Sequence, residues 1–333
     1  MSSSTKLSRL LPTGHDGFLL IAVLLIISVF ALQDLAFLSP RNGFDVFSTY
    51  SVLGILAAGL LIVLISGELD ISFTAVMTAA QYASAVYIIE NGGSWISVFA
   101  VSIFIGVALG MLNALIVHYL NASSVIVTIA TLNLYFGATV VLSSGEWLYA
   151  FPDWFFEGVS IELWAPERGR AYAINLAILA LAGFWALTYL LLYRSSVGRQ
   201  IFAVGGNREA AERVGINILR IRLLSFGFLG LAAGVAAVVH AQLVQTVAPN
   251  ALVGTELEVL AAVVLGGASL TGGVGTFRGM VLGVAFIALM SNGLVISGVS
   301  TYSQKALLGL VIVIAVIATG DGGRLFGRGG RRA

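Results

Sequence analysis

Residues 95–117 read WISVFAVSIFIGVALGMLNALIV, 23 positions in a row without a charged side chain. A helix needs about 20 mostly apolar residues to cross the hydrocarbon core of a bilayer, so this stretch is long enough to span a membrane. Nine other apolar runs occur along the chain: 18–38, 46–66, 73–89, 123–143, 173–193, 223–243, 259–270, 279–297 and 303–319. The sequence therefore predicts an all-α polytopic membrane protein with about ten transmembrane helices.

The composition agrees with a membrane protein. Of 333 residues, 59% are hydrophobic and 10% are charged, whereas about 25% of the residues of a soluble domain are charged. This excludes an ordinary soluble enzyme, a disordered tail and a nucleic-acid binder. The net charge of +1 and the lack of Cys give no reason to expect a polyanionic partner, a metal site or a catalytic site on this chain.

Two details of the span assignment stay open. The run 259–270 is too short to cross a bilayer alone, and the runs 46–66 and 73–89 are separated by only six residues. This second pair is either two spans or one broken helix. The first run has 21 residues, longer than the roughly 7–15 of a signal peptide, so we expect an uncleaved helix.

Positive charges predict the orientation. With ten spans, 13 of the 17 Lys and Arg residues fall on the side of the two termini, which places both termini in the cytoplasm. The predicted organisation is an N-terminal cytoplasmic segment 1–17, a single membrane domain 18–319 and a basic cytoplasmic tail 320–333. The outer segment 144–172 mixes three Trp with acidic residues, typical either of a short helix at the membrane interface or of a solvated loop.

Glycine is frequent inside the runs, with 39 in the chain. Small residues four positions apart let two membrane helices approach closely. Three such pairs occur: Gly106/Gly110, Gly230/Gly234 and Gly279/Gly283. We expect these pairs to be helix-packing faces.

The segment 194–222 predicts a short helix outside the membrane. Asn207 is a good N-cap, Glu209 and Arg213 form an i,i+4 pair, and Gly215 is a good C-terminal stop. The small apolar face of this helix consists of Ala210, Ala211 and Val214. So short a helix is not stable alone, and it must dock either on its own membrane domain or on a cytoplasmic partner.

Two further stretches lie between or beside the runs. Residues 66–72, Ser-Gly-Glu-Leu-Asp-Ile-Ser, form either a polar loop with solvated acids or the break of a broken helix that lines a cavity; an even number of crossings favours the loop. Residues 256–276 are rich in small residues. Neither Lys6 nor Lys305 stands between Gly and Ser or Thr, as the lysine of a phosphate-binding loop does. We therefore expect no such ATP site on this chain.

Four stretches of the chain, 67–72, 205–217, 256–275 and 292–294, together resemble the membrane permease subunits of ribose-type ABC sugar importers. Glu68 and Phe73 depart from that family, which usually has Gly and a small aliphatic residue there. The motif residues that carry the resemblance are Gly67, Asp70, Ser72, Gly266, Gly267, Gly272 and Gly273.

The resemblance implies a permease in a bacterial inner membrane, with the segment 144–172 in the periplasm. It implies a second copy or a paralogue of the permease, a periplasmic substrate-binding protein and a cytoplasmic ATPase subunit that holds ATP and Mg²⁺. Lipid surrounds the spans, and neither a cofactor on this chain nor nucleic acid is expected. The helix in segment 194–222 then becomes the coupling helix that contacts the ATPase. Its residues are Asn207, Arg208, Glu209, Ala210, Ala211, Glu212, Arg213 and Val214.

A substrate path needs polar side chains within the spans. Uncharged donors and acceptors suit a neutral hydroxylated substrate, although each one alone is more often a helix–helix hydrogen bond. The candidates are Gln81, Tyr82, Asn113, Thr128, Asn133 and Asn292.

The leading hypothesis is a permease subunit that moves a sugar or similar polyol inward by alternating access, driven by a separate ATPase. A candidate from another class is an ion-coupled secondary transporter. It needs an ionisable residue at membrane mid-depth, and the apolar runs offer none there. An ABC nucleoside permease and a non-transporting membrane scaffold are the remaining alternatives.

Overall fold

The structure, a computed structural model, describes residues 15–164, 172–300 and, between 303 and 313, all except 305, 308, 311 and 312. The described residues are mostly helical. The helices are α1 His15–Gln33, α2 Pro40–Thr49, α3 Ser51–Ile65, α4 Phe73–Asn91, α5 Trp95–Leu120, α6 Ser124–Leu142, α7 Asp153–Glu157, α8 Leu176–Arg194, α9 Ser196–Gly206, α10 Arg208–Arg213, α11 Ile218–Val244, α12 Thr255–Leu265 and α13 Phe277–Ile296, with a short 3₁₀ turn, η2, at Leu35–Leu38. The strands are β1 Ser160–Trp164 and β2 Tyr172–Asn175.

Six described helices are long and apolar enough to cross a membrane. They are α1 (from Asp16), α5, α6, α8, α11 and α13, and the pair α2 and α3, bent by 51° at its junction, brings the number to seven if it counts as one span. The helix α12 has 11 residues, too few to cross alone, as the sequence predicted. Most of the last predicted run, 303–319, and the whole tail 320–333 lie outside the described residues. The described part therefore does not confirm ten spans.

The runs 46–66 and 73–89 form helices that run in opposite directions. The α2 end of the first run and the far end of α4 both meet the segment 153–175, where Ser48 accepts a hydrogen bond from Asn175 and Gly92 accepts one from Trp154. The other ends join through residues 66–72. A single helix that continues past a break is therefore excluded, and a reversing loop connects α3 to α4.

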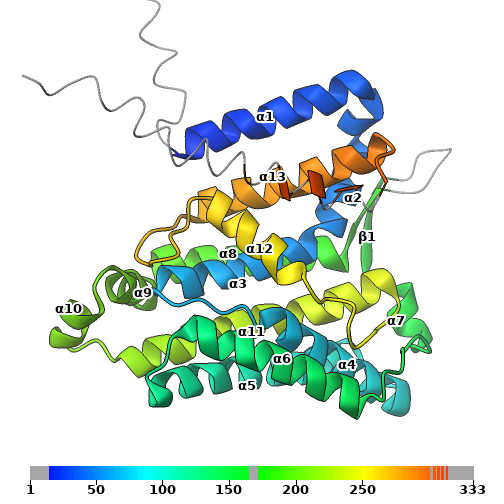
Figure 1. The fold of residues 1–333 in the computed structure, drawn as a ribbon. Coiled ribbons are helices and arrows are strands. Elements are labelled where there is room, and N and C mark those ends of the chain that lie inside the picture. The colour runs from blue at the N-terminus through cyan, green and yellow to red at the C-terminus, as the bar shows by residue number, and fades with distance from the viewer. Residues whose placement is uncertain are drawn as a thin grey trace, which may run out of the picture.

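The segment 144–172 combines a helix with a strand pair. The helix α7 has only five residues, and β1 pairs antiparallel with β2. The short helix was one of the two expectations, but the strand pair departs from an all-α fold. Each strand contains one Ile and one aromatic residue, types that favour extended backbone. Figure 1 shows α7 and β1 at one end of the molecule and α9 and α10 at the other.

The three glycine pairs are packing faces, as predicted. A Cβ on Gly106 or Gly230 would overlap the carbonyl oxygen of the other, so α5 and α11 touch backbone to backbone. Ser102 adds a hydrogen bond of 2.8 Å to the Gly234 carbonyl across the same contact. The pair on α13 packs on α12, where a Cβ on Gly283 would overlap the Ala262 carbonyl. The long helix α11 also packs on α3 and α4, so it is the central helix of this part of the bundle (Figure 1).

Candidate functional site

The helix α10 has the caps that its sequence predicts. The Asn207 side chain accepts a hydrogen bond of 3.0 Å from the Ala210 amide, and the Asn207 backbone is extended. Gly215 has a φ of +87°, a conformation that glycine adopts without the strain a Cβ would cause. These two residues fix where α10 begins and ends.

Most of α10 is exposed. Its Glu209–Arg213 pair spans 3.7 Å with both side chains more than 80% exposed, and Val214 is 78% exposed. Of the three small apolar residues, only Ala211 is buried, while Ala210 and Val214 are exposed. Of the predicted small apolar face, only Ala211 docks on the chain itself, and Ala210 and Val214 stay open to a partner. The helix packs on α9 and projects from one end of the bundle (Figure 1), so nearly its whole surface is free to meet a partner.

Glycines join α9 to two loops, 66–72 and 266–276. We call Gly67, Gly205, Gly206, Gly272 and Gly273 the glycine junction. The Gly273 amide donates a 3.0 Å hydrogen bond to the carbonyl of Ile65 at the end of α3, and a Cβ on Gly205 would overlap that same carbonyl. A Cβ on Gly272 would lie 2.5 Å from the Gly67 Cα. Backbone therefore meets backbone among the loop 66–72, the end of α9 and the loop 266–276.

The other two motif glycines, Gly266 and Gly267, lie where α12 ends and the loop 266–276 begins. Gly267 has a φ of +86° at the end of α12. A Cβ on Gly266 would lie 2.5 Å from the Gly279 carbonyl oxygen on α13. Gly266 thus lets the end of α12 lie against α13 backbone to backbone, next to the loop that carries Gly272 and Gly273.

One of the two acids of the loop 66–72, Asp70, is buried, which corrects the expectation of a solvated charge. Asp70 is 2% exposed, and its Oδ1 accepts hydrogen bonds from the amide and the hydroxyl of Ser72 at 2.7 and 2.6 Å. The Ser72 hydroxyl in turn accepts from the Asn113 amide, and Asn113 accepts from the Tyr135 hydroxyl. Burial raises the pKa of the Asp70 carboxyl, and the hydrogen bonds from Ser72 oppose that rise.

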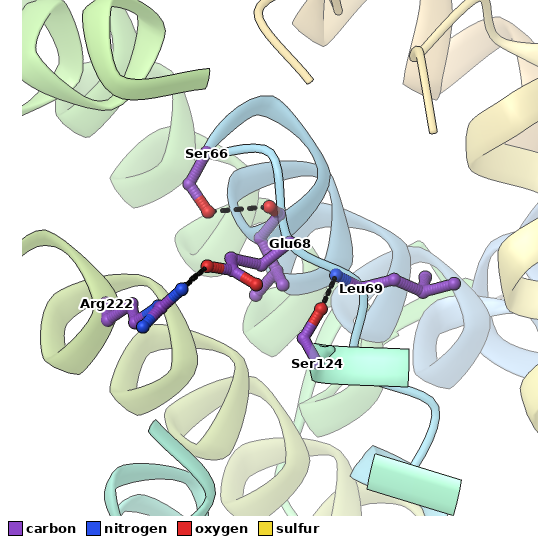
Figure 2. Close-up of polar contacts among 6 residues, drawn as sticks. Ser66, Glu68, Leu69, Ser124 and Arg222 are labelled. Atoms are coloured by element: carbon purple, nitrogen blue, oxygen red, sulfur yellow. Dashed lines mark hydrogen bonds and ion pairs between the residues drawn. The ribbon is translucent and has the colours of Figure 1, made fainter. Parts of the chain in front are cut away.

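The second acid of this loop forms an ion pair. Arg222 on α11 donates from Nε to Glu68 Oε1 at 2.6 Å, and its Nη2 contacts the same oxygen. Both side chains are mostly buried. Beside this pair the Leu69 amide donates to the hydroxyl of Ser124, the first residue of α6, at 3.0 Å. Figure 2 shows Arg222 of α11 beside Glu68 and Ser124 of α6 beside Leu69.

A cavity of about 660 Å³ opens between these groups. Its walls come from the loop 66–72, the start of α6, the junction of α9 and α10, and the loop 266–276. Its charged lining residues among the described part of the chain are Glu68, Arg208 and Arg222. The same described part contains no group of three or more His, Asp or Glu side chains placed to hold a metal ion.

The residues predicted for a substrate path do not gather in one place. Asn113 and Thr128 contact the loop 66–72, with Thr128 accepting from the Ile71 amide at 3.3 Å. Asn133 is exposed and bonds the backbone of its own helix. The remaining contacts are Gln81 to His240 at 2.8 Å, Asn292 to Asn42 at 3.0 Å, and Tyr82 in a separate recess near Glu90 and Glu146. The structure brings together two of the six.

Comparison with known proteins identifies the family of this chain. The family described as "Branched-chain amino acid transport system / permease component" matches residues 42–316. The chain belongs to this family. The ribose import permease protein of Escherichia coli (strain K12) is 30% identical to this permease over 300 residues, covering 90% of this chain and 91% of that protein.

Two further relatives extend the comparison. The autoinducer 2 import system permease protein of Photorhabdus laumondii is 28% identical over 313 residues, covering 94% of this permease and 91% of that protein. The L-arabinose ABC transporter permease protein of Azospirillum brasilense is 28% identical over 305 residues, covering 89% and 85%. No solved structure matches. The predicted resemblance to sugar importer permeases is thus confirmed.

The sequence reasoning missed one buried acid of this permease. Glu256 is 8% exposed and accepts hydrogen bonds from the Thr74 hydroxyl at 3.0 Å and the Gly254 amide at 3.1 Å. It lies three residues before the short run 259–270, where a charge at the end of a span is ordinarily solvated. The short length of that run is the feature of the sequence that indicates a buried acid. A helix of 11 residues begins inside the protein, so the acids in its first turn lie inside the protein too.

Proposed function

We propose that this permease is the membrane subunit of an ATP-driven importer that carries a sugar or sugar-like polyol inward by alternating access. The observation that supports this most strongly is the exposed helix α10, anchored on the inner loops by the glycine junction. Gly205 lies in α9, three residues before α10 begins, and it lies against the backbone of Ile65 at the end of α3 and of Gly273 in the loop 266–276. Energy supplied outside the membrane would therefore move several helices at once.

The ATPase subunit in this proposal is a separate chain that docks on α10 and holds ATP and Mg²⁺. The exposed charges of α10, together with Val214, offer it a mixed polar and apolar contact of the kind found at interface rims. The orientation that follows puts both termini and α10 in the cytoplasm, and α7 with the β1–β2 pair in the periplasm. There they would face a substrate-binding protein. A second permease copy or a paralogue completes the assembly.

The substrate class rests on the named relatives and on uncharged polar groups. Two of the three relatives above are named as a ribose import permease and an L-arabinose ABC transporter permease. In this chain Asn113 and Thr128 lie against the loop 66–72 and Gln81 lies against His240. Amide and hydroxyl groups suit a neutral hydroxylated substrate, and the movement of these helices past one another would open and close its path.

Sugar-stimulated ATP hydrolysis tests this proposal. The permease is assembled with its ATPase and binding protein in nanodiscs, and ATP hydrolysis is measured with ribose, arabinose and no sugar. Stimulation that requires the sugar-loaded binding protein and the permease supports the importer. An ATPase rate that no member of a panel of sugars and polyols changes would instead support a membrane scaffold.

Buried ionisable groups keep ion coupling as a second candidate. Asp70 and Glu256 are buried and lie beside apolar runs, and His240 is largely buried and lies three residues from the end of the run 223–243. Groups of this kind can carry protons in membrane transporters. If sugar uptake into vesicles collapses on addition of an ionophore while ATP is held constant, ion coupling replaces the ATP-driven proposal.

A further inference from the structure

One side of α4 carries a line of buried polar side chains. Thr74, Thr78 and Gln81 follow one another at spacings of four and three residues, so they lie on the same side of the helix. None of the three is more than 1% exposed. We call them the polar face of α4. Burying three polar side chains costs desolvation that apolar residues would avoid, which indicates a role besides packing.

One end of the polar face meets a carboxylate of α12. The Thr74 hydroxyl donates to Glu256 Oε2 at 3.0 Å, and the Gly254 amide donates to the same oxygen at 3.1 Å. Within the described residues both hydrogen bonds of the Glu256 side chain go to Oε2. Each carboxylate oxygen can accept hydrogen bonds, so Oε1 keeps its capacity for a further donor.

The contact between Thr74 and Glu256 lies well inside the membrane bundle. Glu256 is the second residue of α12, whose 11 residues extend about 16 Å along the helix axis. Near Thr74, the Ser72 hydroxyl accepts from Asn113, which lies seven residues, about 10 Å, before α5 ends at Leu120. Helices that begin at such a depth form substrate sites in other transporters.

The other end of the polar face meets α11. The Gln81 Nε2 and the His240 Nδ1 lie 2.8 Å apart, and His240 lies four residues before α11 ends at Val244. The Gln81 Oε1 is buried and has no hydrogen-bond partner among the described residues. A buried acceptor without a donor is costly, so this oxygen is suited to a donor that does not belong to the chain.

We propose that the polar face of α4, together with Glu256 and His240, contacts the sugar as it passes between α4, α11 and α12. In the structure these groups hydrogen-bond one another, so the path is closed. A sugar hydroxyl both donates and accepts. It can donate to the free oxygen of Gln81 or Glu256 and accept from the groups that now bond each other.

This exchange makes the path selective for hydroxyl groups. Replacing one hydrogen bond by another costs little, whereas a molecule without the hydroxyl leaves the buried groups unpaired. Gln81 and Thr74 are seven residues apart, about 10 Å along α4, so a sugar that enters from the His240 end contacts Gln81 first and Glu256 last. The inference rests on the proposed function and adds to it the residues that recognise the substrate.

Competitive uptake of a sugar and its monodeoxy analogues into proteoliposomes tests the inference. The permease is assembled with its ATPase and binding protein, and the sugar is whichever of ribose and arabinose the unaltered complex accumulates. The same binding protein is used throughout, so its own preference cancels between variants. Thr74→Val should lower the preference for the sugar over at least one analogue about tenfold, the value of one hydrogen bond to a charged group. Thr74→Ser keeps the hydroxyl and should restore the preference.

Two threonines provide a matched control. Thr78 and Thr188 are both fully buried, and each hydroxyl donates at 2.9 Å to the carbonyl four residues earlier in its own helix. Only Thr78 lies on the polar face. Thr78→Val should therefore lower the preference for the sugar, whereas Thr188→Val on α8 should leave it unchanged. Co-purification of the ATPase and thermal unfolding show that each variant is folded and assembled.

A further variant covers the case in which Thr74→Val does not fold. Glu256→Gln keeps the size of the side chain and an acceptor oxygen but removes the charge, and it should also lower the preference. An unchanged preference in the folded Thr74, Thr78 and Glu256 variants would overturn the inference, as would equal changes in Thr78→Val and Thr188→Val. If the unaltered complex accumulates no sugar at all, the proposed function fails and the inference fails with it.

Discussion

The ion pair between Glu68 and Arg222 connects residues 154 positions apart. It joins the loop 66–72 to α11, and both side chains are mostly buried. A buried pair of this kind is costly to break, because the remaining partner keeps its charge without compensation.

Removing one member of this pair should destabilise the permease strongly. Glu68→Ala leaves Arg222 buried and unpaired, and we expect a loss of about 3–5 kcal/mol in the free energy of unfolding. The measurement is thermal or denaturant unfolding of the detergent-solubilised chain, followed by tryptophan fluorescence. Adding Arg222→Met should restore much of the loss. If the losses in unfolding free energy of the two single variants simply add in the double variant, the ion pair does not stabilise this loop.

Residue-level inference from the sequence succeeded where the cause was local. The Asn207 cap, the Glu209–Arg213 pair and the Gly215 stop depend on neighbours within one helix, and the structure confirms all three. The pairing of Glu68 with Arg222 depends on how distant segments fold together. Both residues lie just outside apolar runs, so nothing in the local pattern distinguishes them from solvated charges.

At the scale of elements, the glycine junction sets how α9 and α10 attach to the membrane helices. Adjacent glycines allow a matched test of it. A Cβ on Gly205 would overlap the Ile65 carbonyl and lie 2.6 Å from the Gly273 amide nitrogen, whereas a Cβ on Gly206 meets nothing within 4 Å. Neither position has a positive φ, so the two Ala substitutions differ only in the space available to the added methyl group.

We expect Gly205→Ala to abolish or sharply reduce sugar-stimulated ATP hydrolysis in the assembled complex, because the loops must move apart to admit the methyl group. Gly206→Ala should keep activity near that of the unchanged protein. Binding of the ATPase to each variant, measured by co-purification, shows whether the loss lies in transmission rather than in assembly. Equal activity of the two variants would contradict a role for close backbone contact.

The exposed face of α10 gives a second prediction at this scale. Val214 is 78% exposed and packs on little of its own chain, so Val214→Asp should leave unfolding of the isolated permease unchanged. In the proposed complex it places a charge in the docking surface, and we expect ATPase co-purification to fall by at least tenfold. Val214→Thr, which preserves shape, serves as the control. Undiminished ATPase binding by Val214→Asp would move the docking surface away from α10.

The glycine pairs show what helical periodicity alone can predict. Spacing of four residues put Gly106 with Gly110 and Gly230 with Gly234 on single faces, and the contact between α5 and α11 confirms both. The strand pair β1–β2 was missed because five residues such as Ser160–Trp164 fit a strand and a loop equally well until a partner strand is known. The shape of α10 was predicted, but the burial of only Ala211 depends on α9, which the local pattern does not place.

At the scale of the whole molecule, the apolar runs predicted the class of protein and most element boundaries. The ten-run interpretation remains a prediction, because seven crossings at most pass on length and composition among the described residues. The chain reverses its direction between α3 and α4, as in a bundle whose successive helices run in opposite directions. The positions of Asp70 and Glu256 inside that bundle could not be read from hydropathy, since each lies beside a run rather than within one.

The absence of cysteine from the whole chain makes the orientation directly testable. Ser160→Cys places a thiol on the exposed strand β1, and Ala210→Cys places one on the exposed helix α10. In intact cells a membrane-impermeant maleimide should label Cys at position 160 and label position 210 only after permeabilisation. The opposite labelling pattern would invert the orientation and exclude docking of a cytoplasmic ATPase on α10.

The central claim is that energy from a separate ATPase reaches this permease through α10 and drives sugar uptake. Uptake of radiolabelled ribose and arabinose into proteoliposomes tests it most directly, with the permease and binding protein present and the ATPase subunit either included or omitted. We predict accumulation of at least one sugar only when both the ATPase and ATP are present, with no effect of an ionophore. Accumulation that persists without the ATPase, or that an ionophore abolishes while ATP remains, would contradict the account.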